Sequence, residues 1–329
     1  MKKGFNQYAP MRGVQPLLDV IAEKTEALYG AIYHPEKEIT IMPGGTLGIY
    51  AAISAVIREN DEVVIIEPAY DSYIPAIELN GGKAVHVELR YPDYKIDWDE
   101  VKKVITYRTR MIIINTPHNP TGSTLSEDGI QQLIKITKDT DIIVLSDEVY
   151  EHIIFDEPHL SMARYPELAE RSFIVSSFGK TYHTTGWKMG YVVAPENLTK
   201  ELRKVYQFMA FSANTPIQYA LADMLKDPSS YLELSQFYQQ KRDLFQSLIR
   251  DSRFEILPCS GSYFQLLNYD AISDEADVDF ARRLTIEKKI ASIPISVFYR
   301  MKTDSHVLRF CFAKSDETLK QAAEILCKI

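Results

Sequence analysis

Four short apolar runs, rich in valine and isoleucine, constrain the fold of this chain more than any other feature of its sequence. They cover residues 63–66, 111–114, 142–145 and 173–175. Continuous apolar runs of this length are typical of strands buried on both faces, as in a parallel sheet, and not of alternating antiparallel strands. Amphipathic helical patterns lie between them, for example at residues 47–58 and 127–138. The alternation predicts an α/β fold with a mostly parallel central sheet flanked by helices.

The last third of the chain follows a different pattern. Residues 202–249 have the periodicity of amphipathic helices. Strand-like runs follow at residues 254–257, 262–267 and 307–312. A chain of 329 residues is long enough for two domains of ordinary size. We therefore expect a large domain at residues 1–212 and a smaller α+β domain at residues 213–329.

Composition narrows the class of function. Acidic residues exceed Lys and Arg by 45 to 37, so the net charge of −8 gives no electrostatic reason to expect binding to nucleic acid or to an anionic membrane. Cys259, Cys311 and Cys327 lack the spacing of a zinc site or a disulfide framework, and no metal site is predicted. The sequence shows neither an export signal nor an apolar segment long enough to span a membrane. We expect a cytoplasmic protein that acts on small molecules.

Polar side chains follow each apolar run directly. These tips are residues 67–70, 115–120, 146–150 and 176–180. Because ligands of open α/β sheets bind outside the carboxyl ends of the strands, the tips should converge on one site. There Asp147 could hold a cationic ring nitrogen, and Tyr150 could donate a hydrogen bond to an oxygen of the same ring. Taken singly, Asp147 could equally be a capping residue, Tyr150 a core residue and Asn119 a turn former.

A glycine-rich segment at residues 44–48 precedes the first helical pattern, with Thr46 as the expected N-cap. Free backbone amides and the helix dipole at such a start suit an anion, most simply a phosphate. The alternative is a tight turn followed by a capped helix. The glycine spacing does not fit the dinucleotide fingerprint, and Gly179-Lys180-Thr181 further along the chain is not a Walker loop.

Lys180 stands at the end of the fourth run among small residues, and Lys188 follows eight positions later. A lysine amine becomes a useful nucleophile toward a carbonyl when burial or a nearby positive charge favours its neutral form. The setting of Lys180 offers both conditions. The alternative is a solvated lysine in a surface loop.

The motifs HNPTG, SDEVY, SSFGKTY and GWKMGY occur in this order along the chain. Together they resemble the class I/II aminotransferases of pyridoxal-phosphate (PLP) fold type I, and among these the branch of methionine and kynurenine aminotransferases. The resemblance runs from Asn6 to Phe312. It implies an α/β fold of type I, PLP as the cofactor, amino acids and 2-oxo acids as substrates, and a homodimer.

Carried over residue by residue, the resemblance assigns a role to each matching position. Lys180 would form the Schiff base with PLP and then carry the proton between the substrate and cofactor carbons. Asp147 would pair with the pyridinium nitrogen and so keep the ring an electron sink. The other implied PLP contacts are Tyr70 on the ring face, Tyr150 and Asn119 at the ring oxygen, and Gly45, Thr46, Ser177 and Lys188 at the phosphate. Tyr8 would reach the phosphate of the neighbouring subunit, and Arg309 would pair with the substrate carboxylate.

The expected reaction is a ping-pong transfer of an amino group from methionine or an aromatic amino acid to a 2-oxo acid. Tyr33 and Phe211 are expected near the pocket with Asn119, where they would suit an apolar substrate side chain, although core packing explains the two aromatic residues equally well. A carbon–sulfur β-lyase that acts on cysteine conjugates is the alternative, because the same motifs serve both reactions. Relatives carry an arm and a glycine loop ahead of the segment that holds Tyr8, and this chain is expected to lack them. A third expectation is therefore a PLP-binding homologue that turns over poorly.

Overall fold

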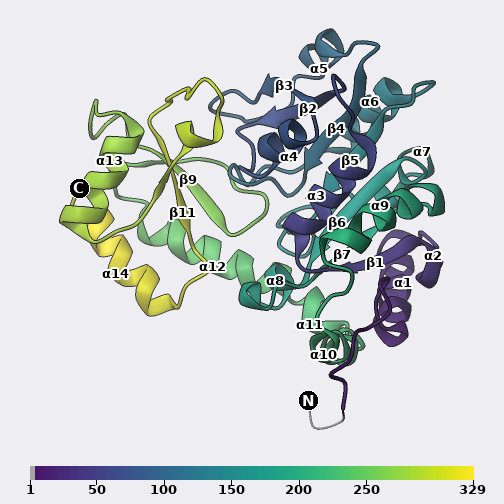
Figure 1. Ribbon diagram of the computed structural model, residues 1–329. Coiled ribbons are helices and arrows are strands. Elements are labelled where there is room, and N and C mark those ends of the chain that lie inside the picture. Colours follow the sequence, from purple (N-terminus) through teal and green to yellow (C-terminus); the bar gives the residue numbers. More distant parts are fainter. Residues whose placement is uncertain (1–3) are drawn as a thin grey trace.

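A seven-stranded sheet forms the centre of the larger part of the molecule in the computed structural model, which describes residues 4–329 (Figure 1). Residues 1–3, which include the two lysines of the amino end, lie outside the described residues. The strands are β1 (Ile39–Met42), β2 (Glu62–Glu67), β3 (Lys83–Glu88), β4 (Thr109–Asn115), β5 (Ile143–Asp147), β6 (Ser172–Ser177) and β7 (Gly190–Val193). Their order is β1-β7-β6-β5-β4-β2-β3, and only β7 pairs antiparallel with its neighbours. The predicted mostly parallel α/β sheet is confirmed.

Helices cover both faces of this sheet. One face packs against α3 (Gly45–Val56), α4 (Tyr73–Leu79) and α9 (Glu196–Met209), and the other against α1 (Gln15–Tyr29), α5 (Trp98–Val104) and α6 (Glu127–Thr137). Within β2, Val63 and Ile65 belong to the first core, whereas Val64 and Ile66 belong to the second. Successive side chains of a strand point to opposite faces, so the continuous apolar runs of the sequence are explained by burial on both sides.

Local signals set the start of several helices. Ser126 Oγ accepts a hydrogen bond from the amide of Gly129 at the start of α6, and acidic residues occupy its first turn. Shorter helices connect the larger elements: α2 (Pro35–Glu38), α7 (Pro166–Ala169), α8 (Phe178–Thr181) and α11 (Ser229–Leu232). Of these, α8 directly follows β6 and carries Lys180.

The smaller part of the molecule is built on a four-stranded antiparallel sheet. Its strands are β8 (Glu255–Ile256), β9 (Phe264–Asn268), β10 (Ile293–Pro294) and β11 (Val307–Cys311), in the order β10-β11-β9-β8. The helices α12 (Leu234–Leu248), α13 (Asp277–Arg283) and α14 (Asp316–Leu326) accompany it (Figure 1). The strand-like runs predicted for this region are strands in the structure.

Helix α10 (Thr215–Leu225) bears on the predicted domain boundary at residue 212. It follows that boundary in sequence, yet it packs against α1 of the larger part. The buried Gln218 side chain accepts a 2.8 Å hydrogen bond from the amide of Val14, just ahead of α1. The division at residue 212 stays a prediction, and α10 lies with the larger part. Within residues 4–329, no helix combines the length and the apolarity needed to cross a membrane.

Candidate active site

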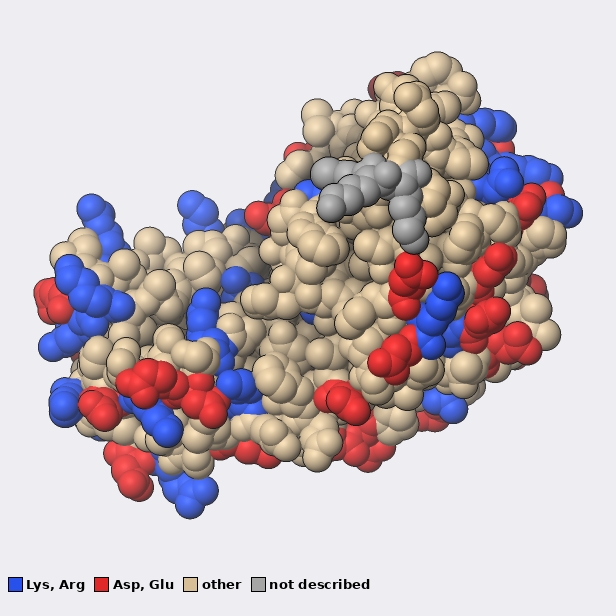
Figure 2. All heavy atoms as spheres, turned by 90° about the horizontal axis from the view of Figure 1, so that it is seen from below, with Lys and Arg blue, Asp and Glu red and all other residues tan. Residues whose placement is uncertain are grey.

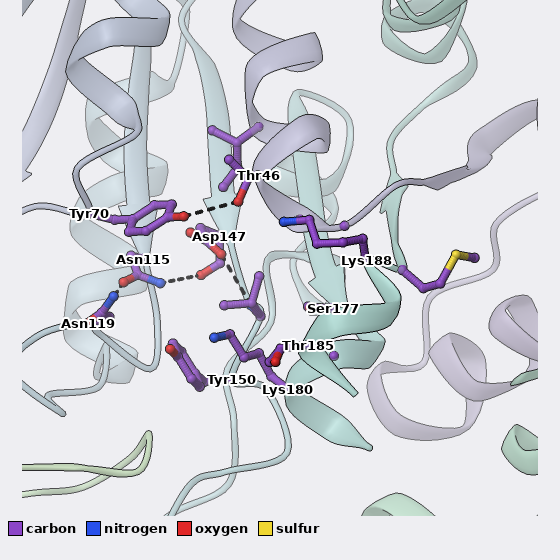
Figure 3. Close-up of a pocket in the computed structure, with 16 residues that line it drawn as sticks. Thr46, Tyr70, Asn115, Asn119, Asp147, Tyr150, Ser177, Lys180, Thr185 and Lys188 are labelled. Carbon is purple, nitrogen blue, oxygen red and sulfur yellow. Dashed lines mark hydrogen bonds between the residues drawn. The ribbon is translucent and has the colours of Figure 1, made fainter. Parts of the chain in front are cut away.

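A pocket opens at the carboxyl ends of β4, β5 and β6, where the start of α3 also lies (Figure 3). It holds about 730 Å³ of empty space, part of it open to solvent. The predicted residues that line it are Gly45, Thr46, Tyr70, Asn119, Asp147, Tyr150, Ser177, Lys180 and Lys188. The structure therefore brings together side chains from every predicted strand tip.

Asp147, the last residue of β5, supplies the carboxylate of the pocket. Its side chain is buried, and the hydroxyl of Tyr73 donates a 2.6 Å hydrogen bond to Oδ2. Burial raises the pKa of Asp147 to about 6, although the hydrogen bond from Tyr73 and the charge of Lys180 act in the opposite direction. A buried carboxylate of this kind is suited to pair with a cationic group of a ligand, because a partner charge would offset its desolvation.

Asn115, the last residue of β4, fixes the neighbouring strand tips relative to each other. Its Nδ2 donates to the backbone oxygen of Asp147 at 2.9 Å, and its Oδ1 accepts from the amide of Asn119 at 2.8 Å. The two contacts link the loop after β4 to β5, and they appear as dashed lines in Figure 3. Asp147 and the backbone of Asn119 are therefore held at fixed positions relative to each other.

Lys180 projects into the pocket from α8. Its Nζ donates a 3.1 Å hydrogen bond to the hydroxyl of Tyr263 and lies 5.5 Å from the ring centroid of Tyr150. Figure 3 shows this amine and the Tyr150 ring side by side, below Asp147. The predicted cluster of amine, phenol and carboxylate is present in the structure.

The start of α3 forms the opposite end of the pocket, with a cation beside it. Gly44 caps the helix with φ 89° and ψ 161°, a conformation open essentially to glycine. A Cβ atom at Gly44 would lie 3.7 Å from Nζ of Lys188. In Figure 3, the Lys188 amine points toward Thr46 and the first turn of the helix. The first helical amides and the lysine therefore face one volume, an arrangement that binds anions.

The predicted N-cap of α3 was wrong. Thr46 lies inside the helix, which begins at Gly45, and no side chain caps it. Its hydroxyl instead shares a 3.1 Å hydrogen bond with the hydroxyl of Tyr70. The physical reason is that the left-handed Gly44 turns the chain directly into the helix, so the first amides stay free of side-chain partners.

Arg309, on β11 of the smaller part, does not line the pocket itself but contacts Asn119, which does. One guanidinium nitrogen donates to Oδ1 of Asn119. The guanidinium carbon lies 3.9 Å from the ring centroid of Phe264 and 5.1 Å from that of Phe298. Burial lowers the pKa of Arg309, while the phenol of Tyr150 raises it. Two aromatic faces and one amide thus hold the planar cation in place.

Three predicted residues are not brought to this pocket within the subunit. Tyr33 is buried in the core of the larger part, where burial and the carboxylate of Glu148 raise the pKa of its hydroxyl. Tyr8 is 82% exposed, and its ring packs edge-on against that of Phe211 at a centroid distance of 5.6 Å. Tyr33 therefore packs in the core, as the alternative interpretation of this residue expected. Tyr8 and Phe211 form an exposed aromatic pair.

Three polar residues that contact the predicted ones were assigned no role from the sequence. They are Asn115, which lies in a predicted strand tip, and Tyr73 and Tyr263. Asn115 had a usable signal, since it ends an apolar run next to the HNPTG motif. Tyr73 and Tyr263 contact partners 74 and 83 positions away in sequence, and nothing local indicates these contacts.

Comparisons with known proteins agree with this geometry. The family model for aminotransferases of class I and II matches residues 1–326. The chain is 48% identical to methionine aminotransferase from Escherichia coli, over 98% of this chain and 84% of that protein. It is 32% identical to kynurenine–oxoglutarate transaminase 1 from Mus musculus, over 98% and 84% of the two chains.

Solved structures show the same similarity. A crystal structure of an Escherichia coli protein with a methionine aminotransferase function superposes with a TM-score of 0.98 at 48% identity, covering 100% of this chain and 87% of that one. N-succinyldiaminopimelate aminotransferase from Mycobacterium tuberculosis superposes with a TM-score of 0.95 at 32% identity, covering 99% and 86%. With a match that extends over nearly its whole length, the chain belongs to the class I and II aminotransferase family of transaminases, which use PLP.

Proposed function

We propose that this transaminase binds PLP through Lys180 and moves an amino group from methionine or an aromatic amino acid to a 2-oxo acid. The observation that carries the proposal is the polarity of the pocket. The pocket combines the amine of Lys180, the buried carboxylate of Asp147 and, beside Lys188, a helix start that no side chain caps.

The donor set of the pocket fits PLP. The phosphate dianion suits the amides at the start of α3 together with Ser177 and Lys188, because the helix dipole and the ammonium both favour negative charge. A protonated ring nitrogen suits the buried carboxylate of Asp147. Among the described residues that line the pocket, Asp147 is the only carboxylate, so no second carboxylate would repel the phosphate.

Each residue then has a task that its chemistry supports. When bound, PLP supplies an electron sink that acidifies the substrate carbon next to nitrogen. Lys180 would hold the cofactor at its aldehyde carbon and, once its amine is free, would accept and return the proton of the substrate carbon at its Nζ. Asp147 would keep the ring nitrogen protonated, and Tyr150 and Asn119 would hold the ring oxygen. Arg309 binds the substrate carboxylate through its planar guanidinium.

The choice of donor is supported by the relatives. The Escherichia coli relative at 48% identity is a methionine aminotransferase, and the mouse relative acts on kynurenine, an aromatic amino acid. Both comparisons cover nearly all of this chain. A donor with an apolar side chain is therefore the substrate class that we propose.

A homodimer completes the proposal. Tyr8 and Phe211 form an exposed aromatic pair, and Phe208 on α9 is 86% exposed nearby in sequence. Figure 2 shows that charged side chains gather toward the two ends of one face and are sparse across its middle. Burying this pair against a second copy would let Tyr8 reach the phosphate of the partner's cofactor.

A donor panel tests the function. The holoenzyme is mixed with one 2-oxo acid and with methionine, phenylalanine, tyrosine, kynurenine, alanine or aspartate in turn, and the new amino acid is measured by mass spectrometry. Methionine and the aromatic donors should give the highest kcat/KM. Activity confined to alanine or aspartate would contradict the substrate class. Ammonia released from a cysteine conjugate without any 2-oxo acid would instead support the β-lyase.

A further inference from the structure

The amine of Lys180 has a hydrogen-bond partner outside every motif of the sequence. Its Nζ donates to the phenol oxygen of Tyr263 at 3.1 Å. The same nitrogen lies 5.5 Å from the ring centroid of Tyr150 and 5.7 Å from that of Tyr263. These two rings meet edge to face, with centroids 5.3 Å apart. Lys180 therefore lies against two aromatic rings, and the Tyr263 hydroxyl holds its reactive atom.

The backbone fixes Tyr263 relative to the active-site loops. The amide of Gly261 donates to the backbone oxygen of Gly122, in the HNPTG motif, at 2.9 Å. The amide of Ser262 donates to the backbone oxygen of Ile153, shortly after the SDEVY motif, at 2.7 Å. Ser262 is fully buried and has φ 63°. The segment that carries Tyr263 is thus tied to two loops of the larger part, although Tyr263 itself precedes β9 of the smaller part.

A close approach of the Gly261 backbone to the ring of Pro117 supports this rigidity. A Cβ atom at Gly261 would lie 2.6 Å from Cβ of Pro117, a distance that real side chains essentially never show. Glycine at this position lets the segment reach the loop after β4. A tyrosine held on such a segment keeps its hydroxyl at a fixed place with little loss of side-chain freedom on each catalytic cycle.

A phenol is an unusually suitable partner for a lysine that changes its protonation state. The hydroxyl of tyrosine both accepts and donates a hydrogen bond, so it can bond an ammonium as an acceptor and a neutral amine as a donor. A carboxylate at this place could only accept, and it would favour the ammonium, which is not nucleophilic. A phenylalanine would leave the amine without a partner in both states.

We propose that Tyr263 is a positioning residue that holds Nζ of Lys180 in place whenever this amine is free of the cofactor. The proposal rests on the proposed role of Lys180. The phenol keeps the nitrogen near the reacting carbons after the amine of the substrate has replaced it, and it remains bonded while Lys180 takes up and releases the proton. Lys180 then returns to the cofactor from a prepared geometry.

The first test follows bond formation between Lys180 and PLP, independently of any amino-acid substrate. The protein freed of cofactor is mixed with PLP and quenched with borohydride at successive times, and the modified peptide is counted by mass spectrometry. In Tyr263→Phe the bond should form about tenfold more slowly or slower still, which corresponds to the loss of one hydrogen bond of a charged group. The final extent at saturating PLP should match that of the wild-type protein.

Tyr238→Phe is the matched control. Tyr238 is buried in the same aromatic cluster, with its ring centroid 5.9 Å from that of Tyr263. The Tyr238→Phe variant also loses a phenol hydroxyl, but it keeps the Tyr263 hydroxyl that bonds Lys180. It should therefore form the bond at the wild-type rate. Tyr263→His keeps a ring that can donate and accept, and it should recover part of the lost rate. Recovery by histidine would not be expected if Tyr263 only filled space.

A second measurement separates positioning from substrate binding. With methionine carrying deuterium on its α-carbon, the rate of a single turnover should be about tenfold lower in Tyr263→Phe than in the wild-type protein. The KM for methionine, measured at steady state, should be nearly unchanged. Equal rates of bond formation and of turnover in Tyr263→Phe and the wild-type protein would overturn the inference. If even the wild-type protein forms no reducible bond at Lys180, the proposed function fails first, so the two failures are distinguishable.

Discussion

Asp147, the carboxylate of the pocket, lies in an environment unlike that of an ordinary solvent-exposed carboxylate. It is 3% exposed, and burial raises its pKa from 3.8 to about 6. The protein without cofactor thus keeps a poorly solvated charge above pH 6. A ring nitrogen that carries a proton would offset this cost, which gives the cofactor a reason to bind in one orientation.

The raised pKa predicts how stability depends on pH. The folded protein without cofactor binds the Asp147 proton more tightly than the unfolded chain, so its stability should fall as the pH rises from about 4 to 6. Asp147→Asn lacks this titration and should gain up to about 3 kcal/mol over the wild-type protein above pH 6. Urea unfolding between pH 4 and 8 measures the difference, with the exposed Asp141→Asn as the control. Identical pH profiles for Asp147→Asn and the wild-type protein would contradict the buried charge.

The guanidinium of Arg309 is held by rings as well as by Asn119, and this predicts a binding defect. Replacing Phe298 by leucine removes the aromatic face at 5.1 Å from the guanidinium carbon. We expect KM for the amino donor to rise about threefold, a loss of about 0.7 kcal/mol, with kcat nearly unchanged. Steady-state kinetics with methionine provide the test, and Phe237→Leu at an exposed position of α12 is the control. A fall in kcat at constant KM would argue against a role in binding.

Residue-level chemistry was predictable where a side chain directly follows an apolar run, and where it belongs to the glycine-rich helix start or to a motif, as Thr46 and Lys188 do. Asp147, Asn119 and Lys180 all follow such runs, and the structure brings them to one pocket. The partners Tyr73 and Tyr263 come from distant segments, so their contacts arise from tertiary packing alone. Tyr33 shows the limit in the other direction, because an aromatic residue carries no sign of whether it lines a pocket or fills a core.

At the scale of elements, burial decided which strands were visible in the sequence. The predicted strands β2, β4, β5 and β6 are covered on both faces and form continuous apolar runs. The edge strand β3 alternates polar and apolar residues and is only partly buried, so it had no such run. The strand β1 has the sequence ITIM and β7 has GYVV, so Thr40 in β1 and Gly190 and Tyr191 in β7 leave no continuous run of valine and isoleucine.

The start of α3 is the element on which phosphate binding should depend most. Gly44→Ala places a Cβ in a conformation that only glycine adopts readily, so we expect a loss of about 1–3 kcal/mol in unfolding free energy. PLP affinity should fall as well, because the first helical amides would turn away from the pocket. Denaturant unfolding and PLP titration measure the two effects.

Gly186→Ala is the control for this helix start. A Cβ at Gly186 meets nothing within 4 Å, although the residue lies only two positions before Lys188. Its stability and PLP affinity should stay near the wild-type values. Equal affinities for the Gly44 and Gly186 variants would count against the helix start as the phosphate site.

At the scale of the whole molecule, the proposed dimer predicts that exposed aromatic residues on α9 matter for cofactor binding. Phe208→Glu places a charge on a side chain that is 86% exposed in the subunit. We expect it to produce a monomer and to weaken PLP binding, because Tyr8 of one subunit would no longer reach the cofactor of the other. Analytical ultracentrifugation and PLP titration provide the readouts.

Tyr107→Glu is the matched control for the dimer. Tyr107 is 90% exposed and precedes the amino end of β4, whereas the pocket lies at the carboxyl ends of the strands. Its assembly state should equal that of the wild-type protein. A Phe208→Glu variant that remains a dimer with unchanged PLP affinity would refute the proposed interface.

We expect Lys180, and not Lys188, to be the lysine that binds PLP covalently. Both amines point into the same pocket, which makes the pair a stringent comparison. The decisive measurement is borohydride reduction of the PLP-loaded protein followed by peptide mapping, for the wild-type protein, Lys180→Ala and Lys188→Ala. We expect a modified residue 180 in the wild-type protein and, at higher PLP concentration, in Lys188→Ala, and no modified residue in Lys180→Ala. A modified Lys188, or a reducible bond that persists in Lys180→Ala, would contradict this expectation.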